Sequence, residues 1–444
     1  MAGIYIHIPF CKQACHYCNF HFSTSLIRKN DFVAALLEEI DQKKGYLGGE
    51  PVDTIYFGGG TPSLLSDEEL KRIMERVRAT FSVDPAAEVT LEANPDDVTM
   101  PGKLEAWRAG GINRLSIGIQ SFFEEDLQWM NRAHTAGQAV DSIKMAKGEG
   151  FDNISIDLIY GSPTLTDDHW AKNVEQAVNL HIPHLSCYAL TVEPRTALDK
   201  MIRQHKKAPV DPDTQARQFL LLMDWLERAG YEHYEISNFA LPGKRSRHNS
   251  SYWQGKKYLG LGPSAHSYDG ISRQWNVANN GLYINALAGE GAADEVAGGA
   301  TAADRRSGAA EVAAADDGSA GKGQALFERE LLTPVQQLNE YIMISLRTME
   351  GCDTGYVSAK FGEAAARELI AGAARYVREG KMRIEYPGMQ ETGQNEEMKV
   401  NGQGLESGQS SETRETGQRL VLTREGKLLA DGIAAELFVV KPSL

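Results

Sequence analysis

Short runs of β-branched and other apolar residues alternate with longer amphipathic stretches over the first two hundred residues of the chain. This alternation is typical of βα units that form a parallel sheet. It predicts six strands, over residues 4–8, 54–57, 89–93, 114–119, 153–158 and 184–189. The intervals between the strands have room for helices, among them residues 31–44, 67–80 and 136–150. Ser66 is the expected N-cap of the second of these helices, because acidic residues follow it in the first turn.

Polar residues that could carry chemistry fall at or just past the ends of these strands. A cysteine cluster follows the first strand, residues 58–61 follow the second, and Glu92 lies at the end of the third. Gln120, Asp157 and Tyr188 occupy the same place on the remaining three. Parallel barrels build their active sites from the loops at this end of the strands. Six units rather than eight predict an α/β fold with a partial, open (β/α)6 barrel, whose open side would admit a large, flat substrate.

The chain beyond the sixth strand changes in composition several times. Residues 213–230 predict an amphipathic helix, and residues 235–270 read as a loop-rich segment crowded with aromatic and basic side chains. Residues 288–325 consist mainly of Ala, Gly and acidic residues, and residues 387–418 are rich in Gly, Glu, Gln, Ser and Thr. Both stretches have too little apolar bulk to offset the entropy of ordering them, so we expect disordered or weakly ordered insertions.

The remaining segments complete the expected domain organisation. Residues 331–349, 355–379 and 420–439 predict helices and a short hairpin, enough for a small α+β domain of winged-helix type. The expected domains are a barrel over residues 1–235, a barrel-closing segment over 236–287, and a C-terminal domain over 326–386 and 419–444.

Composition and charge exclude several classes of protein. The net charge of −14 is the wrong sign for a protein that embraces phosphate backbones, so no nucleic-acid partner is expected. The first residues lack the features of a signal peptide, and no apolar run approaches the ~18 residues that span a bilayer. A basic patch, at Lys244, Arg245, Arg247, Lys256 and Lys257, could pair with ligand carboxylates or be a solvated loop face.

Cys11, Cys15 and Cys18 form a C-x-x-x-C-x-x-C motif without a fourth cysteine nearby. Four thiolates usually hold a four-iron cluster, so three would leave one iron open to a small molecule. A zinc site with His16 or His21 as fourth ligand is an alternative, although zinc motifs usually carry a second pair of ligands farther on. The chain has five cysteines, so none remain for a disulfide framework, and reduced thiolates predict a cytoplasmic protein. Cys187 and Cys352 are isolated, and packing is the expected role of each.

The other residues at the strand ends have individually weaker signals. Gly58, Gly59, Gly60 and Thr61 follow a strand directly, and glycines would let the backbone approach a ligand. Glu92 and Asp157 could accept hydrogen bonds from ribose hydroxyls or an ammonium group, and Arg132 could hold a carboxylate bidentately. Each charged residue could equally be an ordinary surface group. Their joint placement at one end of the sheet favours a common site.

Several longer motifs resemble those of one known superfamily. They are the run from Tyr5 to Cys18, then Gly-Gly-Gly-Thr-Pro-Ser, Glu-Ala-Asn-Pro, Gly-Ile-Gln-Ser-Phe and Ile-Asp-Leu-Ile-Tyr-Gly. Together they resemble the radical S-adenosylmethionine superfamily. Within it, the chain is similar to the branch that contains the oxygen-independent coproporphyrinogen III dehydrogenases (HemN) and the heme chaperones of the HemW type. The likeness covers nearly the whole chain apart from the two insertions.

The resemblance implies a [4Fe-4S] cluster on Cys11, Cys15 and Cys18, with S-adenosylmethionine chelating the fourth iron. It implies that an electron from the cluster, supplied by a separate electron donor, would cleave the sulfonium to methionine and a 5′-deoxyadenosyl radical. The residues expected around S-adenosylmethionine are Tyr5, Tyr17, Gly59, Gly60, Thr61, Glu92, Gln120, Arg132, Asp157 and Ala189.

Three features separate the two branches. In the dehydrogenases the cysteine motif continues as C-x-C, and this chain has Phe20 where the extra cysteine would stand. The dehydrogenases also carry a longer N-terminal extension. Residues 248–253 instead resemble the H-N-x-x-Y-W signature of the heme chaperones, in which the histidine is implicated in heme binding. His248 is therefore the expected heme contact, and His266 is a weaker candidate.

The expected function is accordingly to bind heme as cargo and to deliver it to client hemoproteins. Whether the chain also acts as an enzyme stays open at this point, and radical decarboxylation of coproporphyrinogen III is the alternative. Loose peripheral contact with membrane complexes also stays open.

Overall fold

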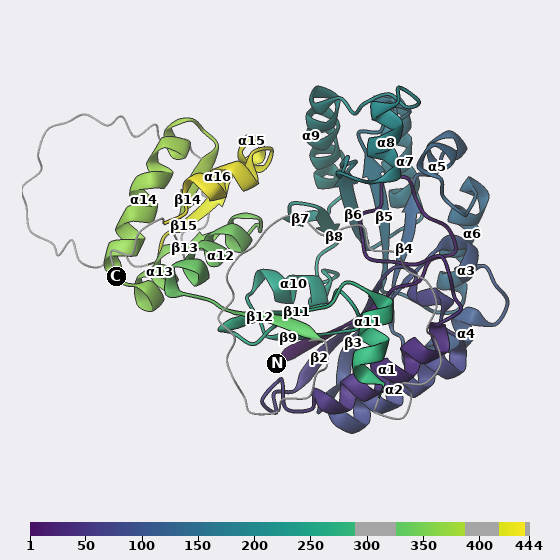
Figure 1. Ribbon diagram of the computed structural model, residues 1–444. Coiled ribbons are helices and arrows are strands. Elements are labelled where there is room, and N and C mark those ends of the chain that lie inside the picture. The colour runs from purple at the N-terminus through teal and green to yellow at the C-terminus, as the bar shows by residue number, and fades with distance from the viewer. Residues whose placement is uncertain (289–325, 387–416, 440–444) are drawn as a thin grey trace, which may run out of the picture.

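The computed structural model describes residues 1–288, 326–386 and 417–439 (Figure 1). The two expected insertions therefore lie outside the described residues, apart from residues 288, 417 and 418. In the described part of the chain, no helix is long and apolar enough to cross a membrane.

All six expected strands form, and they lie side by side in parallel. They are β1 (Ala2–Ile8), β2 (Val52–Gly59), β3 (Val83–Ala93), β4 (Arg114–Gln120), β5 (Ile154–Tyr160) and β6 (His184–Ala189). The third begins earlier than the sequence predicts. The parallel register places Ile4 beside Ile55 and Leu91 beside Leu115, so the carboxyl ends of neighbouring strands meet at one end of the sheet.

Helices cover the outer face of this curved sheet (Figure 1). They are α1 (Lys29–Gln42), α2 (Asp67–Thr80), α3 (Pro95–Val98), α4 (Lys103–Ala109), α5 (Glu124–Met130), α6 (Ala136–Gly148), α7 (Asp167–Asn179), α8 (Ala197–Arg203) and α9 (Pro212–Arg228). A short 3-10 turn, η1, spans Pro62–Leu64. The expected N-cap of α2 is confirmed: Ser66 and Glu69 form a reciprocal capping box. The sequence predicted four helices, over residues 31–44, 67–80, 136–150 and 213–230. They correspond to α1, α2, α6 and α9, and every boundary agrees to within two residues.

The segment predicted as loop-rich also contains short regular elements that the sequence did not predict. It begins at the last residue of β7 (Glu232–Glu235) and holds β8 (Asn238–Ala240), α10 (Arg247–Trp253), β9 (Tyr258–Leu261) and β10 (His266–Tyr268). These elements are too short to show a hydrophobic period. Strand β9 pairs in parallel with β1, so this segment extends the barrel wall.

Both edges of the large sheet continue beyond the six central strands. On one side β10, β11 (Ser272–Asn276) and β12 (Phe327–Leu331) follow β9 in antiparallel pairs, and on the other side β8 and β7 follow β6. Strand β12 lies within the range expected for the C-terminal domain but pairs with β11. Helix α11 (Asn280–Leu287) packs on α1.

The inward positions of the barrel strands are largely polar. The apolar residues of β1, such as Ile4 and Ile6, belong to the main hydrophobic core under the helices. The alternate residue Tyr5 stacks on Tyr56 of β2, whose hydroxyl donates to Glu92 of β3 at 2.8 Å. The alternation follows from the two-residue period of a strand, and it fills the barrel with hydrogen-bonding side chains.

A second hydrophobic core organises the C-terminal part. It is built by α12 (Pro334–Leu346), α13 (Thr354–Phe361), α14 (Glu363–Arg378) and α16 (Ala430–Glu436) around a three-stranded antiparallel sheet. The short helix α15 (Arg424–Lys427) precedes α16. That sheet consists of β13 (Cys352–Asp353), β15 (Arg419–Leu422) and β14 (Met382–Glu385). Helices on a small antiparallel sheet agree with the expected α+β domain. In Figure 1 this part stands beside the end of the barrel where β1 begins.

Glu39 ties the added strands to the barrel. This carboxylate on α1 is fully buried, and it accepts hydrogen bonds from the Tyr283 hydroxyl, the Gly262 amide and the Asn276 side-chain amide at 2.6–2.8 Å. Burial raises its pKa above the usual value for a glutamate. Because the three donors come from α11, β11 and the end of β9, one side chain joins the closing segment to the wall it completes.

Glu39→Ala should therefore destabilise the fold by roughly 2–4 kcal/mol, because it leaves buried donors without an acceptor. Glu38→Ala on the exposed face of the same helix is the matched control, and we expect a change within about 0.5 kcal/mol. Chemical denaturation measures both. Equal effects in the two variants would contradict the role assigned to Glu39.

Candidate functional site

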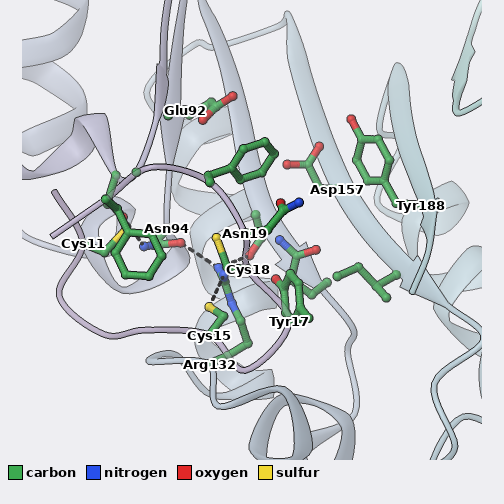
Figure 2. Close-up of a pocket in the computed structure, with 18 of the residues that line it drawn as sticks. Cys11, Cys15, Tyr17, Cys18, Asn19, Glu92, Asn94, Arg132, Asp157 and Tyr188 are labelled. Carbon is green, nitrogen blue, oxygen red and sulfur yellow. Dashed lines mark hydrogen bonds between the residues drawn. The ribbon is translucent and has the colours of Figure 1, made fainter. Parts of the chain in front are cut away.

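A cavity of about 420 Å³ opens at the carboxyl ends of the parallel strands. Cys11, Cys15 and Cys18 lie on one side of it, and Glu92, Asp157 and Tyr188 lie on the other (Figure 2). The sequence placed these residues at the ends of four separate strands, and the parallel register brings them into one chamber. The remaining expected residues that line the cavity are Tyr17, Gly59, Gly60, Thr61, Gln120, Arg132 and Ala189.

The loop that carries the cysteines is held on both sides by the body of the barrel. The Lys12 ammonium pairs with Asp96, at 2.7 Å, and with Asp97 at the start of α3. The Asn131 side-chain amide donates to the Ala14 carbonyl at 2.7 Å, and the Cys11 amide donates to the Ser23 carbonyl at 3.0 Å. These bonds hold the thiols in place before any ligand arrives.

The thiols face polar groups of the barrel. Thr61 Oγ1 lies 3.5 Å from Cys11 Sγ, and Arg132 Nη1 lies 3.3 Å from Cys15 Sγ. Partial burial raises the pKa of Cys11, and it raises the pKa of Cys18 to about 11. A metal centre that needs thiolates must therefore displace protons as it binds.

The zinc alternative finds no support in the positions of the two histidines. His16 Nδ1 is hydrogen-bonded to the Trp129 carbonyl at 3.0 Å, and His21 Nε2 is bonded to Asn280 Oδ1 at 2.7 Å. In the part of the chain that the structure describes, no three His, Cys, Asp or Glu side chains come together as a metal-ion site. The donor set at the cavity is three thiols, which fits an iron–sulfur cluster better than a compact single-ion site.

Opposite the thiols, two carboxylates share the cavity wall. Burial raises the pKa of Glu92 to about 7, and the nearby Asp157 adds to the shift. Burial likewise raises the pKa of Asp157 to about 6, while Ser186 and Arg114 moderate the increase. Two carboxylates that resist ionisation favour a ligand that brings positive charge and hydrogen-bond donors. S-adenosylmethionine has both, in its sulfonium, ammonium and ribose hydroxyls.

Arg132, the residue expected to hold a carboxylate, is engaged by groups of the protein itself. Its Nη2 donates to Asn94 Oδ1 at 2.6 Å and to the Gly118 carbonyl at 2.9 Å, while Nη1 approaches Cys15 (Figure 2). The guanidinium is therefore held by the barrel beside a thiol. A fixed positive charge in this position favours the thiolate that a cluster needs.

The glycine run is required by packing as well as by ligand access. A Cβ on Gly60 would lie 2.6 Å from the Phe10 carbonyl oxygen, next to the first cysteine. Gly59 has φ +108° and lies against the His7 ring. The glycines thus let the cysteine loop lie directly on β2, while Gly59 and Gly60 still line the cavity.

Gln120 reaches the cavity from a strained backbone. Its φ of +65° lies in the left-handed region, and the pairing of β4 with β5 shifts register just before it. Such a conformation costs on the order of 1 kcal/mol for a residue with a Cβ. The bulge turns the end of β4 into the cavity, where Gln120 is one of the lining residues.

Two expected site residues do not line this cavity. Tyr5 lies deeper in the barrel, where its hydroxyl meets His7 Nδ1 at 3.1 Å. His248 on α10 lies near the opposite, amino-terminal ends of β1 and β2, stacked on Tyr56 with ring centroids 4.9 Å apart. It is 1% exposed, and its ring nitrogens meet Thr54 Oγ1 at 2.8 Å and the Tyr252 hydroxyl at 2.9 Å. In this conformation both nitrogens are already engaged.

Sequence reasoning missed Asn94 as a functional residue, although it quoted the motif that contains it. Asn94 lies between Thr61 and Arg132 and hydrogen-bonds both, at 3.3 and 2.6 Å. It thereby connects the groups that contact Cys11 and Cys15. The available signal was its position at a strand end before Pro95, which is the same signal that identified Glu92.

Comparisons with known proteins identify the family of this chain. The model of the Radical SAM superfamily matches residues 5–177. The heme chaperone HemW of Mycobacterium tuberculosis is 40% identical over 291 residues, which are 65% of this chain and 74% of that protein. HemW of Bacillus subtilis is 36% identical over 66% of this chain and 77% of that protein.

The fold has a counterpart among solved structures. Coproporphyrinogen III oxidase (HemN) from Escherichia coli aligns over 99% of this chain and 90% of its own, with a TM-score of 0.74 and 21% identity. At that identity the likeness shows the shared fold alone. The HemW relatives and the match to the superfamily model show that the chain belongs to the HemW family within the radical SAM superfamily.

Proposed function

We propose that this protein is a heme chaperone that carries a [4Fe-4S] cluster and S-adenosylmethionine, binds heme, and delivers it to client hemoproteins. The observation that carries the proposal is the cavity in which three thiols face two buried carboxylates. The HemW relatives, themselves named heme chaperones, support the choice of cargo. When bound, the cluster and S-adenosylmethionine supply one-electron reductive chemistry.

Cys11, Cys15 and Cys18 would hold the cluster, and Arg132 and Thr61 would stabilise its thiolates. The positive charge of Arg132 offsets the negative charge that accumulates on ligating sulfurs. Asn94 fixes the orientation of Arg132 and of Thr61. The remaining polar groups lie on the far wall of the cavity.

Glu92 and Asp157 would bind the cationic and hydroxyl groups of S-adenosylmethionine. Tyr56 positions Glu92 by donating a hydrogen bond at 2.8 Å. Tyr17, Gly59, Gly60, Gln120 and Ala189 would complete the surface around the ligand. Tyr5 would support this surface from deeper in the barrel, because its ring stacks on the ring of Tyr56.

The heme site would include the segment 248–253, with His248 as the contact expected from the family motif. Because Tyr252 occupies the Nε2 side of the His248 ring, direct coordination of heme iron requires the Tyr252 hydroxyl to move away. We further propose a cytoplasmic location and a separate electron donor for the cluster. Radical decarboxylation of coproporphyrinogen III remains the competing activity, and Phe20, which is 68% exposed, stands where the dehydrogenases have a cysteine.

Cys15→Ala should remove the cluster. After anaerobic reconstitution, the wild type should hold about four irons with matching sulfide and absorb near 400 nm, whereas the variant should hold almost none. Cys187→Ala is the matched control, because Cys187 is buried in the hydrophobic core and does not line the cavity. Iron retained at the wild-type level in Cys15→Ala would contradict the assignment.

Affinity for S-adenosylmethionine should rise with pH between 6 and 8. Glu92 and Asp157, with pKa values of about 7 and about 6, attract the sulfonium only when ionised. Protonating Glu92 should weaken binding by about tenfold at pH 6. Equilibrium dialysis of the reconstituted protein measures this, and Glu92→Gln should bind weakly at every pH. The same slope in that variant would rule out Glu92 as the titrating group.

His248→Ala should weaken heme binding by about tenfold or more, if loss of the contact costs at least 1.4 kcal/mol. Titration of hemin, followed by its Soret absorbance, measures the affinity, and thermal melting checks the fold. His205→Ala, at an exposed helix end, serves as the control and should bind like wild type. Unchanged heme affinity in His248→Ala would contradict the role of His248 as the heme contact. Abundant formation of protoporphyrinogen from coproporphyrinogen would contradict the proposed chaperone function.

A further inference from the structure

A second cavity, larger than the first, lies between the barrel and the C-terminal domain. Its volume is about 740 Å³, and its walls come from β9–β11 and α10 on one side and from α12 and α13 on the other. We call it the interdomain cleft. Because Tyr258 pairs with Gly3 at the start of β1, the cleft lies at the amino-terminal ends of the strands, opposite the thiol cavity.

Tyrosine rings line both walls of the interdomain cleft. On the barrel side, the Tyr252 and Tyr258 rings meet edge to face with centroids 4.7 Å apart, and Tyr268 lies beyond Tyr258. On the other side, Tyr341 and Tyr356 have centroids 4.4 Å apart, and Tyr356 is 42% exposed. Facing aromatic walls suit a flat, apolar ligand.

Cations outnumber carboxylates among the residues that line the cleft. The positive side chains are Arg245, Lys256, Arg273, Lys360 and Arg419. The negative ones are Glu340, Glu350 and Asp353.

Several of these charges already pair across the cleft, as Arg273 does with Glu340 at 2.9 Å and Arg245 with Glu350 at 2.6 Å. Lys360 instead makes its hydrogen bond to the neutral Tyr356 hydroxyl, at 3.1 Å. Arg419 and Lys256 lie farther from their carboxylate partners, Asp353 and Asp53, each at 3.9 Å. The positive charge of Lys360 is therefore the one most available to a ligand with carboxylates.

Two hydrogen-bond donors of lining residues lack an acceptor. Within the described residues, neither Trp253 Nε1 nor Arg419 Nε has a hydrogen-bond partner, although both atoms are buried. Arg347 of the C-terminal domain lies over the Trp253 ring at 5.5 Å, so Trp253 is held at the boundary between the two parts. Buried donors without acceptors are unfavourable unless a ligand or solvent satisfies them.

We propose that the interdomain cleft is the heme site, and that the C-terminal domain supplies half of it. The macrocycle lies between the tyrosines of the two walls, and its propionates are bound by Lys360 and Arg419. This inference rests on the proposed heme-chaperone function and adds to it the location of the cargo. It places heme at the opposite end of the barrel from S-adenosylmethionine.

The same geometry gives the motif at 248–253 a physical reason. His248 and Tyr252 are four residues apart on α10, so they lie on one face of the helix. Tyr252 lines the cleft and contacts His248 Nε2, whereas His248 lies behind it. A rotation of the Tyr252 side chain exposes His248 Nε2 toward the bound macrocycle.

Heme and heme dimethyl ester distinguish the parts of this proposal, because the ester lacks both carboxylates. The full-length protein is titrated with each, in the wild type, Lys360→Glu and Tyr356→Ala. Both substituted residues are exposed on α13, so the fold should be kept, and thermal melting verifies this. Lys360→Glu should weaken heme binding by about tenfold and leave the ester unaffected. Tyr356→Ala should weaken both ligands by similar factors.

Arg367→Glu is the matched control, since it makes the same kind of charge reversal on α14 outside the cleft and should change neither affinity. If the wild type binds heme but Lys360→Glu and Tyr356→Ala bind both ligands like the wild type, the cleft is not the site. If the wild type binds no heme, the proposed function fails instead. An equal loss of heme affinity in Lys360→Glu and Arg367→Glu would show that the effect depends on net charge alone, and it would contradict the proposed contact.

Discussion

The parallel alignment of β1 to β6 is the constraint on which the other features depend. Because all six strands run in one direction, every βα loop opens at the same end of the barrel. The cysteine loop, Thr61, Glu92, Gln120 and Asp157 are far apart in the chain and meet only for this reason. The opposite end has a different chemistry, since it is closed by α10 and faces the C-terminal domain (Figure 1).

The two walls of the thiol cavity carry charged groups of opposite sign. Arg132 lies beside the thiols, and the carboxylates of Glu92 and Asp157 lie across from them. Arg114 and Arg132 only partly offset the charge of Asp157, whose pKa stays raised. An anionic cluster next to Arg132 and a cationic sulfonium next to the carboxylates would neutralise both sides together. A ligand with one sign of charge would satisfy only half of the chamber.

Much of this arrangement could be predicted from the sequence because it depends on local patterns. The six strands, the N-cap at Ser66 and the cysteine motif all have signals that extend over a few adjacent residues. The closing strands have no such signal, because β8 and β10 have three residues each and are too short to show a hydrophobic period. The true partners of Arg132 and the deep position of Tyr5 also depend on side-chain contacts between strands.

The interdomain cleft also depends on contacts between distant segments that no local sequence pattern indicates. Its walls come from α10, β9 to β11, α12 and α13, which are separated by a long segment outside the described residues. No pattern in the sequence predicts that Tyr268 and Tyr356 would border the same space. The basic patch near Lys244 was visible, however, and two of its members, Arg245 and Lys256, prove to line the cleft.

The most direct test of the central claim is the electron paramagnetic resonance spectrum of the reduced, reconstituted protein before and after addition of S-adenosylmethionine. An iron with a vacant ligand position, facing Glu92 and Asp157, predicts a [4Fe-4S]⁺ signal whose g-values shift when the nucleotide binds. A spectrum that does not change at saturating S-adenosylmethionine would show that the protein itself completes the coordination of the cluster. That result would contradict an open iron in the thiol cavity.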